Sequence, residues 1–189
     1  MFIQIEATPN PSTLKFIPDA EILESGQTFN FSIGDEVAIS PLAERLFSLS
    51  GINNLFITDS FISVTKAADI EWNTLQTLIV SAITDHLVAG HPVILKRYIL
   101  DEHAVSNGDS SDSEVVQKIK DLIETMVRPA VAQDGGDILY HDFIDGAVYL
   151  KLYGACSGCP SSAFTLKSGV ENMLKHYIPE VKSVEQVYY

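Results

Sequence analysis

Residues 146–177 read GAVYLKLYGACSGCPSSAFTLKSGVENMLKHY, which is a strand, a short loop and a helix in immediate succession. The alternation in AVYLKLY predicts the strand. Apolar residues then return at helical spacing and mark the buried side of a helix from about Ser161 to His176: Phe164, Leu166, Val170, Met173 and Leu174. A second strand, ILYHDF, precedes the first one, and Asp145-Gly146 between them is a strong hairpin signal. This stretch therefore predicts an antiparallel hairpin followed by a helix.

The residues on either side complete a small domain. Ser111-x-x-Glu114 forms a capping box that can begin a helix, and Pro129 ends or kinks this helix. DGGD at 134–137 predicts a tight turn, and SVEQV at 183–187 a short terminal strand.

The first hundred residues also mix strands and helices. Ser40 can cap a helix that begins at Pro41, and a longer helix is expected from Asp69, its cap, to about Ala89, where Gly90 and Pro92 stop it. Strands are expected in FIQIEA, TLKFI, NLFI, FISVT and VILKRYIL, with a hairpin turn at 58–60.

The clearest break in the chain is DEHAVSNGDSSDS at 101–113, a polar stretch with four acidic residues and no lysine or arginine. Such a composition is typical of a solvated, flexible linker. The predicted domains are therefore 1–100 and 114–189, joined by this acidic linker. The predicted fold class is α+β, as two small domains.

The 189 residues carry 25 acidic and 12 basic side chains, a net charge of −13. Such a surface repels polyanions, so neither nucleic acid nor an anionic membrane is an expected partner. No segment approaches the roughly 20 apolar residues that span a bilayer. The N-terminus lacks the basic region of a secretion signal. A cytoplasmic protein is expected, or a mitochondrial matrix protein if this is a mature organellar form.

The two cysteines, Cys156 and Cys159, lie three positions apart on the loop before the helix. This spacing lets both sulfur atoms face one metal centre. The N-terminal end of a helix favours thiolate over thiol. Gly154 and Gly158 allow close approach of the backbone, and Pro160 suits a first helical position. The flanking residues predict an exposed turn.

Three functions fit this CxxC pair: a redox dithiol, half of a zinc site, or half of an iron–sulfur site. A zinc ion or an iron–sulfur cluster usually takes four protein ligands. One chain supplies two cysteines, and no histidine lies at ligand spacing from them. A metal centre therefore predicts either a homodimer joined across the metal or completion by a small thiol.

DGGDILY at 134–140, followed by GAVYLKLYGACSGCPSSAFTLKSGVENMLKHYIPEV, closely resembles the C-terminal domain of NifU and NifU-like scaffold proteins. ATPNPSTLKF, SPLAERLF and FISVTK resemble the N-terminal domain that accompanies it in Nfu proteins. Together these two resemblances cover nearly the whole chain apart from the linker.

The resemblance implies an iron–sulfur cluster carrier, not an enzyme, with Cys156 and Cys159 as the cluster ligands. It implies a 4Fe–4S cluster, with 2Fe–2S as the alternative, that bridges two subunits. Such a cluster is received from upstream donors and passed to apo acceptor proteins. A thiol–disulfide oxidoreductase remains the alternative, because CxxC at a helix start is also the thioredoxin arrangement, although Gly154-Ala155 stands where thioredoxins usually have Trp.

Other polar residues are expected to have structural roles. Asp134 and Asp137 are interpreted as turn residues that bond the local backbone. None of the five histidines is expected to be a ligand, and His86 is expected to be a partly exposed helix residue. Lys151 and Lys167 are expected on a solvated face, although they could offset the negative charge of a cluster.

Overall fold

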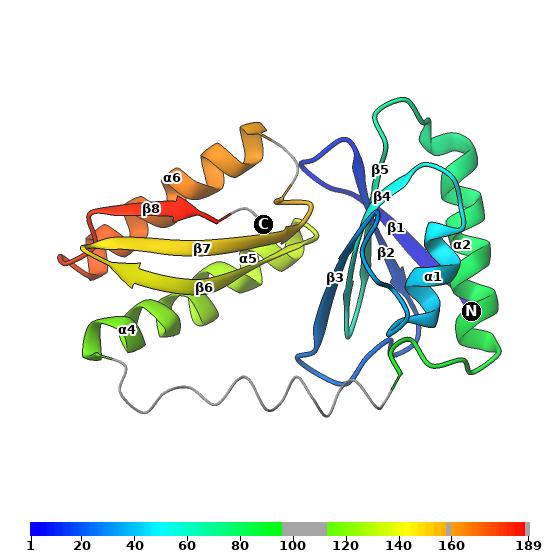
Figure 1. Cartoon of the computed structure of the whole chain (residues 1–189), viewed down its shortest axis with the longest axis horizontal. Coiled ribbons are helices and arrows are strands. Elements are labelled where there is room, and N and C mark those ends of the chain that lie inside the picture. Colours follow the sequence, from blue (N-terminus) through cyan, green and yellow to red (C-terminus); the bar gives the residue numbers. More distant parts are fainter. Residues whose placement is uncertain (96–112, 158–159, 188–189) are drawn as a thin grey trace. The chain divides into compact units, whose positions relative to one another are not determined.

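The computed structural model describes residues 1–95, 113–157 and 160–187, with the backbone alone for 160–165. Backbone contacts divide the chain into two compact units, Met1–Asn107 and Gly108–Tyr189. Each unit holds a sheet and helices, so the predicted α+β class with two small domains is confirmed (Figure 1). The predicted linker lies, apart from Ser113, outside the described residues, and the domain boundaries stay a prediction.

The first unit is a five-stranded antiparallel sheet in the order β1-β2-β5-β4-β3. The strands are β1 (Ile3–Ala7), β2 (Thr13–Pro18), β3 (Thr28–Ser32), β4 (Ile52–Thr58) and β5 (Ile62–Lys66). Helices α1 (Pro41–Phe47) and α2 (Trp72–Val88) cover the same face of the sheet (Figure 1). Phe16, Leu42 and Ile79 are fully buried between these layers.

Local chemistry explains two of these element ends. The Ser40 hydroxyl accepts from Ala43 N at 3.1 Å and donates to Val93 O at 2.8 Å, so the predicted cap also ties α1 to a distant segment. At the β4–β5 hairpin, Thr58 Oγ1 accepts from Phe61 N at 2.9 Å, which closes the predicted turn. Both predictions are confirmed.

Several predictions for the first unit are wrong. Helix α2 begins at Trp72 with Glu71 as the N-cap residue, so Asp69 does not cap it. His86 is 2% exposed, not partly exposed, because it packs under the segment that follows α2 and its Nε2 lies 3.1 Å from Pro92 O. Residues 93–95 form no strand, and the rest of that predicted strand lies outside the described residues. Strand β3 was not predicted.

The second unit is a three-stranded sheet in the order β6-β7-β8. Its strands are β6 (Gly136–Ile144), β7 (Ala147–Gly154) and β8 (Ser183–Gln186), and β8 pairs parallel to β7. Its helices are α4 (Glu114–Leu122), the π-helix η1 (Ile123–Val127), α5 (Arg128–Gln133) and α6 (Pro160–Tyr177). Buried residues of all four helical segments pack in one cluster with residues from a single face of the sheet. The helices before β6 and the helix after β7 therefore cover the same face.

The β6–β7 hairpin turns at Asp145 and Gly146, which have φ values of 53° and 90°, as the predicted two-residue turn requires. The predicted capping box at Ser111 is wrong, because Ser113 caps α4 and accepts from Val116 N at 3.3 Å. Glu114 pairs instead with Lys118, at 2.7 Å. Pro129 does not end the helix, because helical geometry continues from η1 into α5. The π-helical turn before it shifts the register, so that Pro129 falls in the first turn of α5, where its missing N–H is tolerated.

Candidate metal centre

Cys156 lies on the loop between β7 and α6, as the sequence predicted. Gly154 ends β7 with a φ of 63°, a conformation that glycine adopts readily. The carbonyl of Gly154 accepts from Ser157 N at 3.2 Å and from Ser157 Oγ at 2.9 Å, which closes the turn around Cys156. Cys159, the second predicted ligand, and Gly158 lie outside the described residues.

The Cys156 side chain is 6% exposed and packs with the core of the second unit. The prediction of an exposed turn is therefore wrong for Cys156, although Ser157 beside it is exposed. Burial first, and then the negative charges of Asp134 and Asp137, together raise the pKa of the Cys156 thiol to about 12. The expectation of a favoured thiolate is also wrong for Cys156, because desolvation and two carboxylates disfavour the anion.

Gly136, the first residue of β6, lies directly against the sulfur of Cys156. Together with Gly135 it makes up the glycine floor of the cysteine. A Cβ atom at position 136 would stand 2.6 Å from Cys156 Sγ and 2.7 Å from Tyr153 O. The neighbouring Gly135 O accepts from Ala155 N at 3.1 Å. Gly136 thus brings its backbone against the sulfur, where any side chain would collide.

Asp137 follows this floor directly and is 4% exposed. Arg128 pairs with both of its oxygens, Nε with Oδ1 at 2.8 Å and Nη2 with Oδ2 at 2.7 Å. The same guanidinium donates from Nη1 to Glu124 at 2.8 Å. A fork of this geometry is the arrangement in which arginine satisfies a carboxylate most fully. Arg128 therefore links the helical layer to the start of β6, beside Cys156.

The interpretation of DGGD as a simple turn is correct in part. Asp137 Oδ1 accepts from Ile138 N at 2.8 Å, which is the predicted kind of local backbone bond. Asp134 is exposed and ends α5, but its side chain makes no such bond within the described residues. The ion pair of Asp137 with Arg128 was missed. The sequence gives one hint of this ion pair, because Arg128 is the only arginine in residues 114–189.

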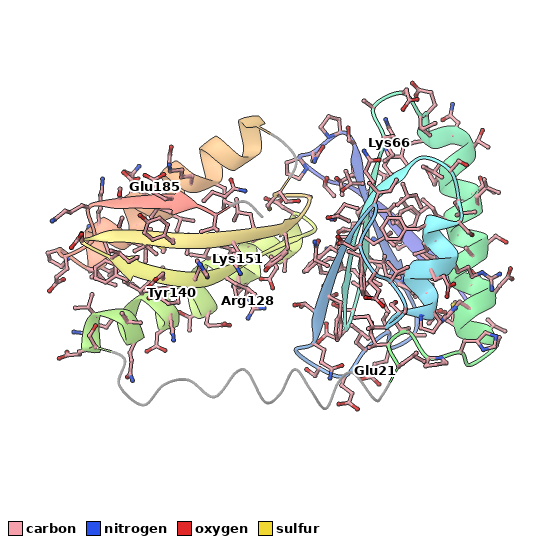
Figure 2. All side chains as sticks on the ribbon, in the orientation of Figure 1. Glu21, Lys66, Arg128, Tyr140, Lys151 and Glu185 are labelled. Carbon is pink, nitrogen blue, oxygen red and sulfur yellow. The ribbon has the colours of Figure 1, made fainter. Side chains whose placement is uncertain are left out.

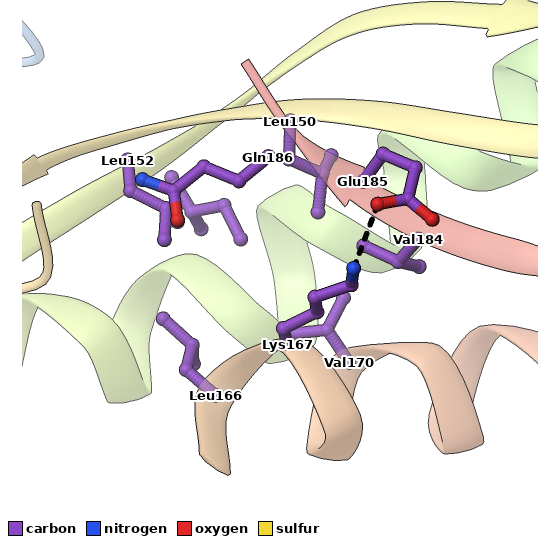
Figure 3. A pocket seen from close by; sticks show the side chains of 9 residues that line it. Leu150, Leu152, Leu166, Lys167, Val170, Val184, Glu185 and Gln186 are labelled. Atoms are coloured by element: carbon purple, nitrogen blue, oxygen red, sulfur yellow. Dashed lines mark hydrogen bonds and ion pairs between the residues drawn. The ribbon is translucent and has the colours of Figure 1, made fainter. Parts of the chain in front are cut away.

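A narrow gap lies between the sheet and α6 (Figure 3). Its lining includes Leu150, Leu152 and Leu166. Its volume of about 10 Å³ is close to that of one water molecule. Lys167 at its edge pairs with Glu185 at 2.7 Å, so its charge is engaged there. Lys151 lies on β7 (Figure 2).

Within the described residues, no three His, Cys, Asp or Glu side chains gather closely enough to hold a metal ion. The described helices also include none that is long and apolar enough to cross a membrane. The structure describes three residues of the site. The thiol of Cys156 is buried against the glycine floor, the carboxylate of Asp134 is exposed, and the carboxylate of Asp137 is paired with Arg128.

Comparison with known proteins gives two family matches. The family described as "Scaffold protein Nfu/NifU N terminal" matches residues 3–90, and the "NifU-like domain" matches residues 119–185. A solved NifU-like protein from Saccharomyces cerevisiae is 30% identical, with a TM-score of 0.46 over 50% of this chain and 85% of that one.

Two curated relatives carry the name "NFU1 iron-sulfur cluster scaffold homolog, mitochondrial". The human protein is 45% identical over 99% of this chain and 72% of its own length. The Drosophila persimilis protein is 43% identical over 100% of this chain and 66% of its own length, so the chain spans just under two thirds of that relative.

Proposed function

The chain belongs to the Nfu/NifU family of scaffold proteins, and from this premise we propose that Cys156 and Cys159 bind an iron–sulfur cluster as thiolates. The cluster is cargo, most simply a 4Fe–4S cluster with 2Fe–2S as the alternative. Because such clusters usually take four thiolates and one chain has two cysteines, two copies of the chain hold it between them.

The close packing of Gly136 against Cys156 Sγ is the observation that supports this proposal most directly. The glycine floor holds the sulfur from one side, and it has no side chain that could stand between the sulfur and a cluster. Gly154 and the bonds of Ser157 fix the loop from the other side. The position of this sulfur, at one end of the sheet, is therefore set by the backbone around it.

The raised pKa of Cys156 is compatible with metal binding, because iron displaces the thiol proton on binding. The enclosed position implies that the loop opens when the cluster enters or leaves. In transfer, each iron–thiolate bond to this chain that breaks is replaced by a bond from a thiolate of the acceptor. The oxidation state of the cluster is therefore unchanged. The partners are upstream cluster donors and apo iron–sulfur proteins.

A thiol–disulfide oxidoreductase is a weaker fit. Thiol–disulfide exchange requires attack by a thiolate. Burial and the nearby Asp134 and Asp137 disfavour the thiolate of Cys156 in the metal-free chain, and no cation of the described residues is among the groups that set its pKa. A carrier without catalytic activity agrees better with this environment.

The role of the first unit in this proposal is to dock partners, while residues 114–189 bind the cluster and residues 101–113 act as a flexible connection. The name of the relatives includes a mitochondrial location, and we extend this location to the present chain.

Anaerobic reconstitution with iron and sulfide tests the proposal. About four iron and four sulfide per two chains are expected for a 4Fe–4S cluster, with a dimeric mass for the loaded species and a Mössbauer spectrum that identifies the cluster. Cys156→Ala should lose the cluster, whereas Lys118→Gln, which breaks only the exposed pair with Glu114, should still load. Full retention of iron and sulfide by Cys156→Ala would contradict the proposal.

A further inference from the structure

Asp134 lies close to the cysteine through the backbone. The hydrogen bond from Ala155 N to Gly135 O, at 3.1 Å, joins the two residues that adjoin Cys156 and Asp134. Asp134 therefore directly precedes one residue of this bonded pair, at the end of α5, and Cys156 directly follows the other. The backbone of Asp134 is itself fixed, because its N–H donates to Ala130 O at the end of α5.

The two acids near the cysteine differ in what offsets their charge. Asp137 is buried and its carboxylate is held by both arms of the Arg128 guanidinium. Asp134 is exposed, and in the described part of the chain its carboxylate makes no hydrogen bond or ion pair. The negative charge of Asp137 is therefore largely neutralised, whereas that of Asp134 is not.

An uncompensated carboxylate next to a cluster ligand acts against the loaded state. The thiolates and their cluster together carry net negative charge, so binding the cluster brings like charges together. Their repulsion falls off with distance and is weakened by salt, but is not cancelled where one of the groups is buried.

We propose that Asp134 is a release-tuning residue, whose carboxylate destabilises the cluster at Cys156 by charge repulsion and thereby favours transfer to an acceptor. It does not bind iron. This inference rests on the proposed function and adds to it the residue that sets how firmly the cargo is held. In a dimer that shares one cluster, two copies of Asp134 act on it.

Three consequences distinguish this role from a structural one. Removing the charge should slow the loss of the cluster. Reduction adds a negative charge to the cluster, so removing the carboxylate should also move the reduction potential in the positive direction. In the metal-free chain, an anionic reagent should reach Cys156 more easily when Asp134 is neutral.

The test compares Asp134→Asn with Asp145→Asn, which removes the same charge at the opposite end of the β6–β7 hairpin. Reconstituted chains are treated with an iron chelator, and the half-life of the cluster absorbance is measured at low and high salt. Asp134→Asn should lengthen the half-life by roughly three- to tenfold at low salt and by less at high salt, as expected for a charge interaction. Asp145→Asn should behave as the unmodified chain does.

The second readout needs no cluster. In a Cys159→Ser background, Cys156 is alkylated with iodoacetate, which is anionic, and with iodoacetamide, which is neutral. The ratio of the two rates cancels differences in exposure, and it should rise with Asp134→Asn but not with Asp145→Asn. Unchanged half-life, potential and rate ratio in Asp134→Asn would overturn the inference. If the unmodified chain loads no iron and sulfide, the proposed function fails instead, and the release role fails with it.

Discussion

Gly136 supports Cys156 from the neighbouring strand: a Cβ atom at position 136 would stand 2.6 Å from the sulfur and 2.7 Å from Tyr153 O. Non-bonded heavy atoms do not approach so closely without displacement of one of them. The position of the thiol is therefore set by a residue 20 positions earlier in the chain, and the glycine is required by this contact.

Gly136→Ala should move the cysteine loop and lower the free energy of unfolding of the second unit by about 1–3 kcal/mol, because one of the crowding atoms belongs to the backbone and cannot rotate away. Cluster loading should fall with it. Urea unfolding followed by circular dichroism measures the stability. The matched control is Gly169→Ala on α6, where a new Cβ meets nothing within 4 Å and should stabilise the helix. Equal effects of the two substitutions would contradict this explanation.

Arg128→Gln should leave the Asp137 carboxylate buried and without its partner. A cost of about 2–4 kcal/mol in the free energy of unfolding is expected, because breaking one side of an enclosed ion pair strands the other charge. Asp137→Asn in the same chain should restore part of the loss, and a double-mutant cycle measures the coupling. Lys118→Gln, which breaks the exposed pair with Glu114, should have no measurable effect.

The stability of the first unit should fall as the pH drops below about 6.5, the ordinary pKa of histidine. Burial lowers the pKa of His86, and His91 and Arg45 lower it as well, while its bond to Pro92 acts in the opposite direction. Between the unfolded and the folded pKa the unfolded chain takes up a proton that the folded unit does not, so acidification favours unfolding.

His86→Gln should reduce this pH dependence, because glutamine can still donate to Pro92 O but does not titrate. Trp72, the only tryptophan, lies in the first unit, with its Nε1 donating to Pro11 O at 3.2 Å, so its fluorescence follows this unit alone. Urea midpoints at pH 7.5 and pH 5.5 measure the effect. His141→Gln in the second unit is the control, and an equal pH dependence in His86→Gln and the unmodified chain would refute the assignment.

A fragment of residues 108–189 should fold and load the cluster without the first unit. The hydrophobic core around Ile123, Val148 and Leu174 is complete within this unit. Circular dichroism and the iron and sulfide content after anaerobic reconstitution check this expectation. A fragment that is folded but takes up no iron would assign part of the site to the first unit.

The elements that the sequence predicts correctly are those whose signals are local. The Asp145-Gly146 turn, the Ser40 cap and the helix after the CxxC loop each depend on backbone preferences and bonds within a few residues. Strand β3, with the alternating Phe29 and Phe31, was missed, because a five-residue strand is specified by its pairing with β4 rather than by its own residues.

The sequence alone also determined the α+β class, the family and the position of the cysteines between a strand and a helix. Only the tertiary structure decided the environment of Cys156: its burial, the glycine floor from β6 and the acids on either side of that floor. Likewise, only folding joined Arg128 to Asp137. Solvent exclusion and the Coulomb interaction depend on distances in space. Folding brings a helix against the strand that follows it, and the positions of the contacting residues in the sequence do not reveal these distances.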